Sequence, residues 1–218
     1  MAAGALIACA SQPAHAQDAG PAVDSRSSPA GEYVHSEMEL VAGILLREDG
    51  TFEYGFTVGS LDERASGRWK VVDRRIELTS DPRPVAPTVT ADRTDLTPGQ
   101  PFGFRVLGPD GRDVPGVDFR VEFDHGDPVE GYTPGDSWFP PQDQRRSVRF
   151  ISFSMPSYRL KSERLPLEAR DGRTAIFKLT PNDFGVADLT GSFADLEGPT
   201  LTLHRPEGTM EFRRRGKD

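Results

Sequence analysis

Histidines and carboxylates are the side chains of this chain that could carry out acid–base or metal chemistry. His35, His125 and His204 lie far apart, and none has a second ligand at a spacing typical of a zinc site. Asp124, His125 and Asp127 form the one group in which a mixed metal site is conceivable. Because aspartate and glycine are turn formers, a polar hairpin loop is the favoured interpretation of this group.

Sequence motifs of catalysis are missing. The chain has no Gly-x-Ser-x-Gly nucleophile elbow, no His-Glu-x-x-His motif and no glycine-rich phosphate loop. Carboxylate pairs such as Glu37 and Glu39 are expected by chance among 34 acidic residues. The sequence therefore predicts a protein that is not an enzyme and that uses no cofactor and no metal.

The clearest candidate for a binding site is an aromatic strand. Phe52, Tyr54 and Phe56 alternate with polar or small residues, which is the period-two pattern of a strand with one apolar face. We expect Trp69 to lie near them, across the same sheet. These four side chains either fill a core or line a pocket for a small apolar ligand. A cavity of several hundred Å3 would distinguish the two.

A second candidate is the loop over residues 131–146. Tyr132, Trp138 and Phe139 lie among prolines there and are followed by Arg145 and Arg146. Stiff aromatic loops flanked by arginine are typical of surfaces that contact proteins or glycans. The alternative is that the tryptophan fills the end of a sandwich core, which is the more common place for a large aromatic near a strand end.

Residues 1–16 predict export. A short apolar run is followed by Pro13 and by the cleavage pattern Ala14-His15-Ala16, so cleavage would release a periplasmic or secreted protein. Residues 6–9 also resemble a bacterial lipobox, and lipidation of Cys9 would instead anchor the protein in the envelope. Residues 17–30 are small, polar and proline-containing, which predicts a disordered tether.

Charge and composition limit the partners. The formal net charge is −8 and the isoelectric point is about 5.1, which argues against nucleic acid or an anionic membrane surface. No apolar stretch after residue 17 approaches the ~20 residues of a spanning helix, so we expect membrane contact only if Cys9 is lipidated. Cys9 is the single cysteine, and cleavage after Ala16 would leave no thiol for a disulfide or a metal.

Short alternating segments predict an antiparallel β-meander over residues 31–80. The run from Met38 to Leu46 is apolar at every second position, and Asp49-Gly50 makes a tight turn before the aromatic strand. Three prolines within residues 82–87 end the meander and predict an extended linker at a domain boundary.

Residues 86–180 predict a β-sandwich module. Val117, Phe119, Val121 and Phe123 alternate with charged residues. The apolar face changes at Phe150-Ile151, which predicts a β-bulge or burial on both faces. No segment has a sustained helical period, so the predicted fold class is all-β.

Residues 182–214 change the predicted architecture, because they contain three further strand candidates. A five-stranded meander leaves two open edges, whereas eight strands close a small barrel around side chains or one small ligand. We therefore predict that residues 31–80 and 182–214 form one small antiparallel barrel into which the sandwich is inserted. Two β units in series are the alternative.

Two segments resemble known families. Residues 106–117, Val-Leu-Gly-Pro-Asp-Gly-Arg-Asp-Val-Pro-Gly-Val, are similar to the immunoglobulin- or transthyretin-like sandwich modules of exported bacterial proteins. The meander resembles a lipocalin-like half-barrel in four short motifs: Gly31-Glu32-Tyr33, Asp49-Gly50-Thr51-Phe52, Gly67-Arg68-Trp69 and Ile76-Glu77-Leu78. Both resemblances imply a binding or scaffolding protein.

Three classes of function follow. The first is a non-catalytic protein of the bacterial envelope that binds a small apolar ligand or a partner protein. The second is a structural or interaction module without a ligand. The third and least favoured is a hydrolase, which would require His125 or His204 to meet a carboxylate and a serine in one cleft.

Overall fold

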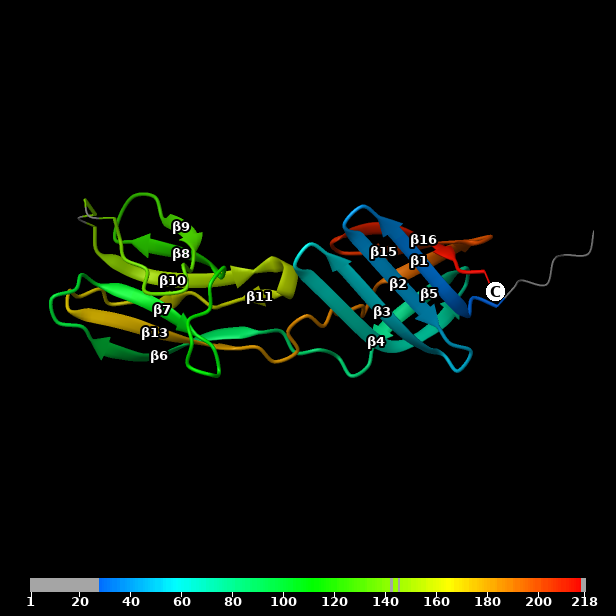
Figure 1. Ribbon diagram of the computed structural model, residues 1–218, viewed down its shortest axis with the longest axis horizontal. Coiled ribbons are helices and arrows are strands. Elements are labelled where there is room, and N and C mark those ends of the chain that lie inside the picture. The colour runs from blue at the N-terminus through cyan, green and yellow to red at the C-terminus, as the bar shows by residue number, and fades with distance from the viewer. Residues whose placement is uncertain (1–27, 142, 145, 217–218) are drawn as a thin grey trace, which may run out of the picture.

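The computed structural model describes residues 28–141, 143–144 and 146–216. The predicted signal peptide with Cys9, most of the predicted tether, and Arg145 lie outside the described residues. Figure 1 shows two β lobes arranged end to end, a barrel built from both ends of the described chain and a sandwich built from its middle. The predicted fold class, an all-β chain with a small antiparallel barrel and further sheets, is confirmed.

The barrel closes in the strand order β1-β16-β15-β14-β5-β4-β3-β2, so each strand pairs with its neighbours in an up-and-down meander. The sandwich interrupts this meander between β5 and β14. The barrel strands are β1 (Gly31–Glu37), β2 (Leu40–Leu46), β3 (Thr51–Val58), β4 (Leu61–Val72), β5 (Arg75–Ser80), β14 (Phe193–Glu197), β15 (Thr200–Arg205) and β16 (Gly208–Arg214).

Tight turns define the barrel hairpins. The predicted Asp49-Gly50 turn lies between β2 and β3, where Asp49 accepts hydrogen bonds from the backbone and the hydroxyl of Thr51. The expectation that Met38 continues the apolar face of β2 is wrong, because Met38 and Glu39 form the turn between β1 and β2. Met38 is 94% exposed as a result.

The interior of the barrel is packed with side chains away from the sandwich. Tyr33, Phe52 and Phe212 are among its largest fully buried residues. Tyr33 also donates a hydrogen bond to the carbonyl of Pro29 over 2.7 Å, so the last residues of the predicted tether lie against this end of the barrel. A hollow of about 410 Å3 lies at this end beside Pro29, Val71 and Ile76. A second cavity, with walls from both halves of the barrel, lies at the opposite end, which faces the sandwich.

Gly67 marks a close approach of backbones within the barrel. A Cβ atom at this position would lie 2.1 Å from the carbonyl oxygen of Thr79 and 2.8 Å from the Cα of Ser80. Such distances are far below van der Waals contact, so only glycine fits in β4 beside the end of β5. The chain leaves the barrel immediately after Ser80, the last residue of β5.

Two facing sheets form the sandwich. One has the order β6-β13-β7, with β7 parallel to β13, and the other has the order β11-β10-β8-β9, with β12 also paired to β10. The sandwich elements are β6 (Thr88–Leu96), β7 (Gly103–Leu107), β8 (Asp118–Phe123), β9 (Val129–Tyr132), β10 (Val148–Met155), the single-turn 3₁₀ helix η1 (Pro156–Tyr158), β11 (Leu160–Lys161), β12 (Leu165–Pro166) and β13 (Arg173–Thr180).

Aromatic side chains dominate the sandwich core. Phe104 is fully buried, and its ring lies within 6.1 Å of the rings of Phe119, Phe153 and Phe177. The predicted bulge in β10 is confirmed, since its pairing with β8 shifts between Val148 and Phe150. The shift explains the change of face in the sequence pattern.

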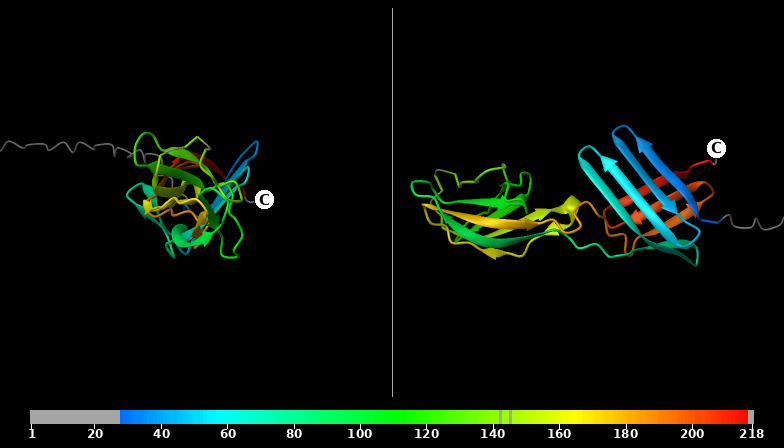
Figure 2. Two further views of the ribbon diagram at one scale, coloured as in Figure 1. Left: turned by 90° about the vertical axis from the view of Figure 1, so that its left-hand side faces the viewer. Right: turned by 60° about the horizontal axis from the view of Figure 1, so that its bottom comes forward.

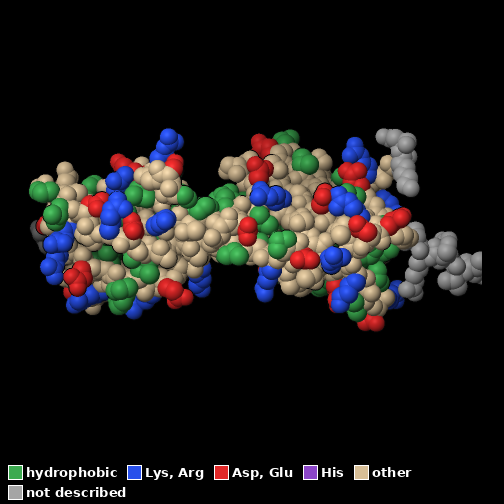
Figure 3. All heavy atoms as spheres, turned by 90° about the horizontal axis from the view of Figure 1, so that it is seen from below, with side chains coloured by type: hydrophobic (Ala, Val, Ile, Leu, Met, Phe, Trp, Pro, Cys, Tyr) green, Lys and Arg blue, Asp and Glu red, His purple; other side chains and the backbone are tan. Residues whose placement is uncertain are grey.

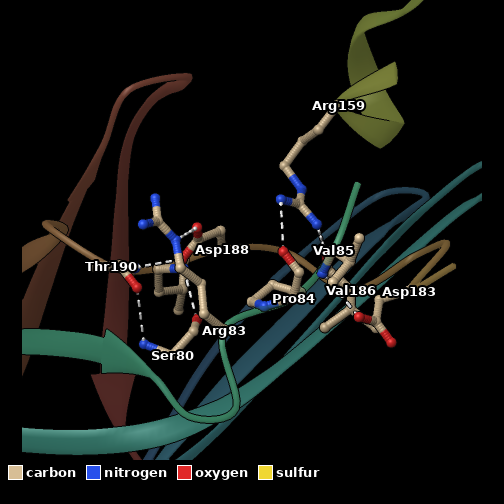
Figure 4. Close-up of polar contacts among 10 residues, drawn as sticks. Ser80, Arg83, Pro84, Val85, Arg159, Asp183, Val186, Asp188 and Thr190 are labelled. Carbon is tan, nitrogen blue, oxygen red and sulfur yellow. Dashed lines mark hydrogen bonds and ion pairs between the residues drawn. The ribbon is translucent and has the colours of Figure 1, made fainter. Parts of the chain in front are cut away.

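The two lobes meet at a narrow junction. Figure 3 shows the molecule narrowing between them, and the views in Figure 2 show the same separation. In Figure 4, Arg159 reaches from the sandwich to the chain segments that enter and leave the barrel. Its guanidinium donates hydrogen bonds to the carbonyls of Val186 over 3.0 Å and Pro84 over 3.5 Å. Tyr158 stacks on Phe184, with ring centroids 3.9 Å apart, so η1 is held above the open end of the barrel.

Candidate functional site

The candidate site is a cavity of about 310 Å3 at the barrel end that faces the sandwich, which we call the barrel mouth. Apolar side chains from both halves of the split barrel form its walls. Tyr54 and Phe56 come from β3, Leu203 from β15 and Met210 from β16. The volume lies at the lower end of the range for small-molecule sites.

Both lobes contribute to the barrel mouth. The turns that begin β4 and β16 bring Leu61 and Gly208 to its rim. Ser157, in η1 of the sandwich, lines the cavity from above. Since the contacts of Tyr158 and Arg159 hold η1 in place, the sandwich completes a cavity that the barrel alone would leave open.

A polar cluster lies among these apolar walls. Arg205 donates hydrogen bonds through Nη1 to the hydroxyl of Tyr54 over 2.8 Å and to Oε2 of Glu63 over 3.0 Å. Its Nε donates to Oε2 of Glu207 over 3.2 Å. The side chains of Arg205 and Glu63 are only 14% and 12% exposed, so this ion pair is largely removed from water.

Burial and charge act in opposite directions in this cluster. Burial raises the pKa of the Tyr54 hydroxyl above its ordinary value of 10.0, although the Arg205 guanidinium acts to lower it. Burial acts to lower the pKa of Arg205, but Tyr54 and Glu63 outweigh it, and the net effect is a raised pKa. Tyr54 is therefore neutral and Arg205 is charged at neutral pH.

The four aromatic residues predicted to bind a ligand separate in the structure. Tyr54 and Phe56 line the barrel mouth. Phe52, on the same face of β3, is 1% exposed and belongs to the packed interior. Trp69 lies six positions beyond Glu63 on β4, about 20 Å along the strand. Its indole donates to the carbonyl of Arg47 over 3.0 Å, at the opposite end of the barrel.

The predicted contact loop also divides. Trp138 packs against the core, with its ring 5.0 Å from that of Phe104, and the two backbones exchange hydrogen bonds. Arg146 stacks on the ring of Phe123 at 4.1 Å and donates to the carbonyls of two residues of the 124–127 loop. Tyr132 and Phe139 are 70% and 39% exposed, so these two retain surface that a partner could contact.

Histidine chemistry has little support in the geometry. His125 lies 2.8 Å from Asp124 and is 72% exposed. His204 lies 3.1 Å from Asp195 and 3.3 Å from the hydroxyl of Thr209. It projects from the outer face of the barrel, because its neighbours Leu203 and Arg205 point inward. Within the described part of the chain, no three His, Cys, Asp or Glu side chains are grouped as metal ligands would be.

Sequence reasoning missed most of the barrel mouth. Arg205 was detectable, because Leu201, Leu203 and Arg205 continue one period-two face and place the arginine inward. Its pairing with Glu63 had no local signal, since 142 positions separate them. The contribution of Ser157 depends on how two lobes meet, which no sequence pattern reports.

Comparisons with known proteins add no relative: no family model, curated protein or solved structure matches this chain. Among the described residues, no helix has the length and apolar character required to cross a membrane.

Proposed function

We propose that this protein is a non-catalytic, exported binding protein that takes a small apolar ligand into the barrel mouth. The observation that carries this proposal is the cavity of about 310 Å3 between apolar walls of β3, β15 and β16. At the ~30 Å3 that one water molecule occupies in the liquid, it has room for about ten non-hydrogen atoms. Eight-stranded barrels are of the size that holds one small ligand.

The wider setting is part of the same proposal. The closed up-and-down order of the barrel supports a lipocalin-like carrier, and the two-sheet insertion supports an immunoglobulin- or transthyretin-like module. Residues 1–16 would direct the protein to the periplasm or outside the cell, with lipidation at Cys9 as the alternative. The sandwich would then serve to cover the ligand and to contact a partner through Tyr132 and Phe139.

The proposal is tested by titrating the protein with 1-octanol, an uncharged probe of nine non-hydrogen atoms. We expect a dissociation constant of about 0.1–1 mM, which corresponds to about −4 to −5.5 kcal/mol. Amide chemical shifts in two-dimensional NMR spectra should change at Leu203, Arg205 and Thr209. Signals of Trp69, at the opposite end of the barrel, should stay in place.

A matched pair of variants on β4 localises the binding. Leu61→Trp puts a large ring into the barrel mouth and should abolish octanol binding. Val71→Trp adds the same ring at the other end of the strand, where Val71 borders the hollow beside Pro29, and should leave binding unchanged because the ligand does not use that hollow. Absence of octanol binding to the unmodified protein, or equal binding by Leu61→Trp, would contradict the proposed function.

A further inference from the structure

We propose that the ligand of the barrel mouth is a cationic amphiphile, with a short apolar body that ends in a protonated amine. This inference rests on the proposed function, because it names the class of molecule that the same cavity takes. Three features support it: the hydrogen bonds of Arg205, the free acceptors beside it, and the charge of the surrounding turns.

Arg205 bonds acidic and phenolic oxygens through three of its five N–H donors. Its guanidinium bonds Tyr54, Glu63 and Glu207 at 2.8–3.2 Å. Nη2 of Arg205 takes part in none of the hydrogen bonds found among the described residues, so a ligand carboxylate can approach the guanidinium there. It would then lie beside Glu63 and Glu207, two carboxylates that already outnumber the single guanidinium, and like charges held this close repel each other. Displacing Glu63 instead would break a largely buried ion pair, which is strongly unfavourable. The barrel mouth therefore does not suit fatty acids, although it contains an arginine.

The cluster also has hydrogen-bond acceptors that are not used. Glu63 and Glu207 each bond Arg205 through Oε2. Among the hydrogen bonds found in the described residues, Oε1 of neither carboxylate takes part. A ligand group that donates several hydrogen bonds and carries a positive charge matches these oxygens best, and an ammonium group has three donors.

Acidic residues dominate the turns around the barrel mouth. The segments 37–40, 58–63 and 205–208 contain five carboxylates and one arginine; the carboxylates belong to Glu37, Glu39, Asp62, Glu63 and Glu207. These turns surround the end of the barrel from which the chain departs to the sandwich. Excess negative charge around an opening concentrates cations near it and repels anions.

Basic groups close to these turns are turned away or already bonded. Arg64 is exposed on the outer face of β4, between the inward positions of Glu63 and Ala65. Arg159 is bonded to the carbonyls of Pro84 and Val186. His35 lies 2.7 Å from the carbonyl of Glu211 and 3.4 Å from the carboxylate of Glu37, which does not line the cavity. None of these groups is placed to neutralise the carboxylates that line the cavity.

The experiment compares three probes of nearly equal size at neutral pH: octylammonium, 1-octanol and octanoate. We expect octylammonium to bind the full chain at least five-fold more tightly than 1-octanol, and octanoate to bind more weakly than 1-octanol. Methylammonium, which has the charge without the apolar body, should not bind. Added salt should reduce the advantage of octylammonium over 1-octanol, because charges near the surface are screened.

Two exposed carboxylates provide the test and its control. Glu207→Gln should reduce the advantage of octylammonium over 1-octanol to about two-fold or less. The affinity of the variant for 1-octanol is measured beside it, so that the ratio reports the loss of the charge. Glu207 is 61% exposed, so its replacement should not impair folding. Glu197→Gln removes another exposed carboxylate, at the other end of the barrel, and should preserve the advantage.

The outcomes separate this inference from the proposed function. If 1-octanol binds but octylammonium binds no more tightly than 1-octanol, the inference is overturned and the proposed function stands. The same holds if octanoate binds most tightly of the three. Glu197→Gln could also remove the advantage of octylammonium over 1-octanol as fully as Glu207→Gln does. The affinity for the amine would then depend on the net charge of the protein and not on the barrel mouth, and this result too would overturn the inference. If none of the probes binds, both proposals fail.

Discussion

Val85 and Asp183 lie 98 positions apart in the sequence, and hydrogen bonds join them side by side. The backbone N–H of Val85 donates to Oδ2 of Asp183 over 2.8 Å, and the backbone N–H of Asp183 donates to the carbonyl of Val85 over 3.1 Å. Asn182 adds a bond to the carbonyl of Ala86 over 2.8 Å. The segments that leave and re-enter the barrel are thus held together independently of the sandwich.

This pairing predicts that the barrel folds without its insertion. Residues 87–181 can be replaced by a short glycine-serine linker between Ala86 and Asn182, whose contact keeps the ends close. We expect cooperative thermal unfolding of this protein, measured by circular dichroism. It should bind 1-octanol more weakly than the full chain, because Ser157 no longer covers the barrel mouth.

The matching control is the fragment 31–80. It contains five of the eight barrel strands and leaves Phe52 without most of its buried partners, so it should show no cooperative transition. A cooperative transition in this fragment would show that the first five strands are a domain by themselves and would contradict the split barrel.

Gly67→Ala should destabilise the barrel by about 1–3 kcal/mol or more, the usual cost of forcing atoms into a filled space. The new Cβ atom would overlap the backbone of Thr79 and Ser80. Gly55→Ala, on the adjacent strand β3, is the control, because no atom lies within 4 Å of the added Cβ. Urea unfolding measures both, and equal stability of the two variants would show that β5 can move aside.

Phe104→Ala should destabilise the sandwich by about 3–5 kcal/mol, because it leaves a cavity in a core of aromatic rings. Tyr132→Ala removes an aromatic of similar size from the exposed surface of β9 and should change stability by less than about 0.5 kcal/mol. The two values come from denaturant unfolding followed by the fluorescence of Trp138, which packs on Phe104.

Asp188 should make the junction sensitive to acid. Burial acts to raise the pKa of this carboxyl, but hydrogen bonds from Thr190 and the pairing with Arg83 outweigh it, so the pKa lies below its ordinary value of 3.8. A lowered folded-state pKa contributes stability above that ordinary value, and the contribution is lost as the pH falls through the lowered value.

The measurement compares unfolding of the unmodified protein with Asp188→Asn between pH 6 and pH 2. The difference in stability should be largest at pH 6 and should shrink below about pH 4. Glu197→Gln reports the effect of removing one exposed carboxylate. A difference that stays constant across the pH range would show that the Asp188 contacts do not depend on its charge.

The fold was more predictable than the site. Alternating apolar positions and Asp-Gly turns indicated the barrel strands, and the three further strand candidates in residues 182–214 completed the eight strands that close one small barrel. The position of Trp69 was not predictable in the same way. Period two shows which face a side chain takes, but it does not show how far along a strand the side chain lies.

The seam between β5 and β14 also has a consequence for biosynthesis. β5 ends at Ser80, and its partner begins only at Phe193, after the whole sandwich has been made. At ~5–20 residues per second, a ribosome needs on the order of 10 s to cross that distance. During this interval the nascent half-barrel presents β1 and β5 as unpaired edges, which are templates for aggregation. The edges are covered only when β14 pairs with β5 and β16 pairs with β1.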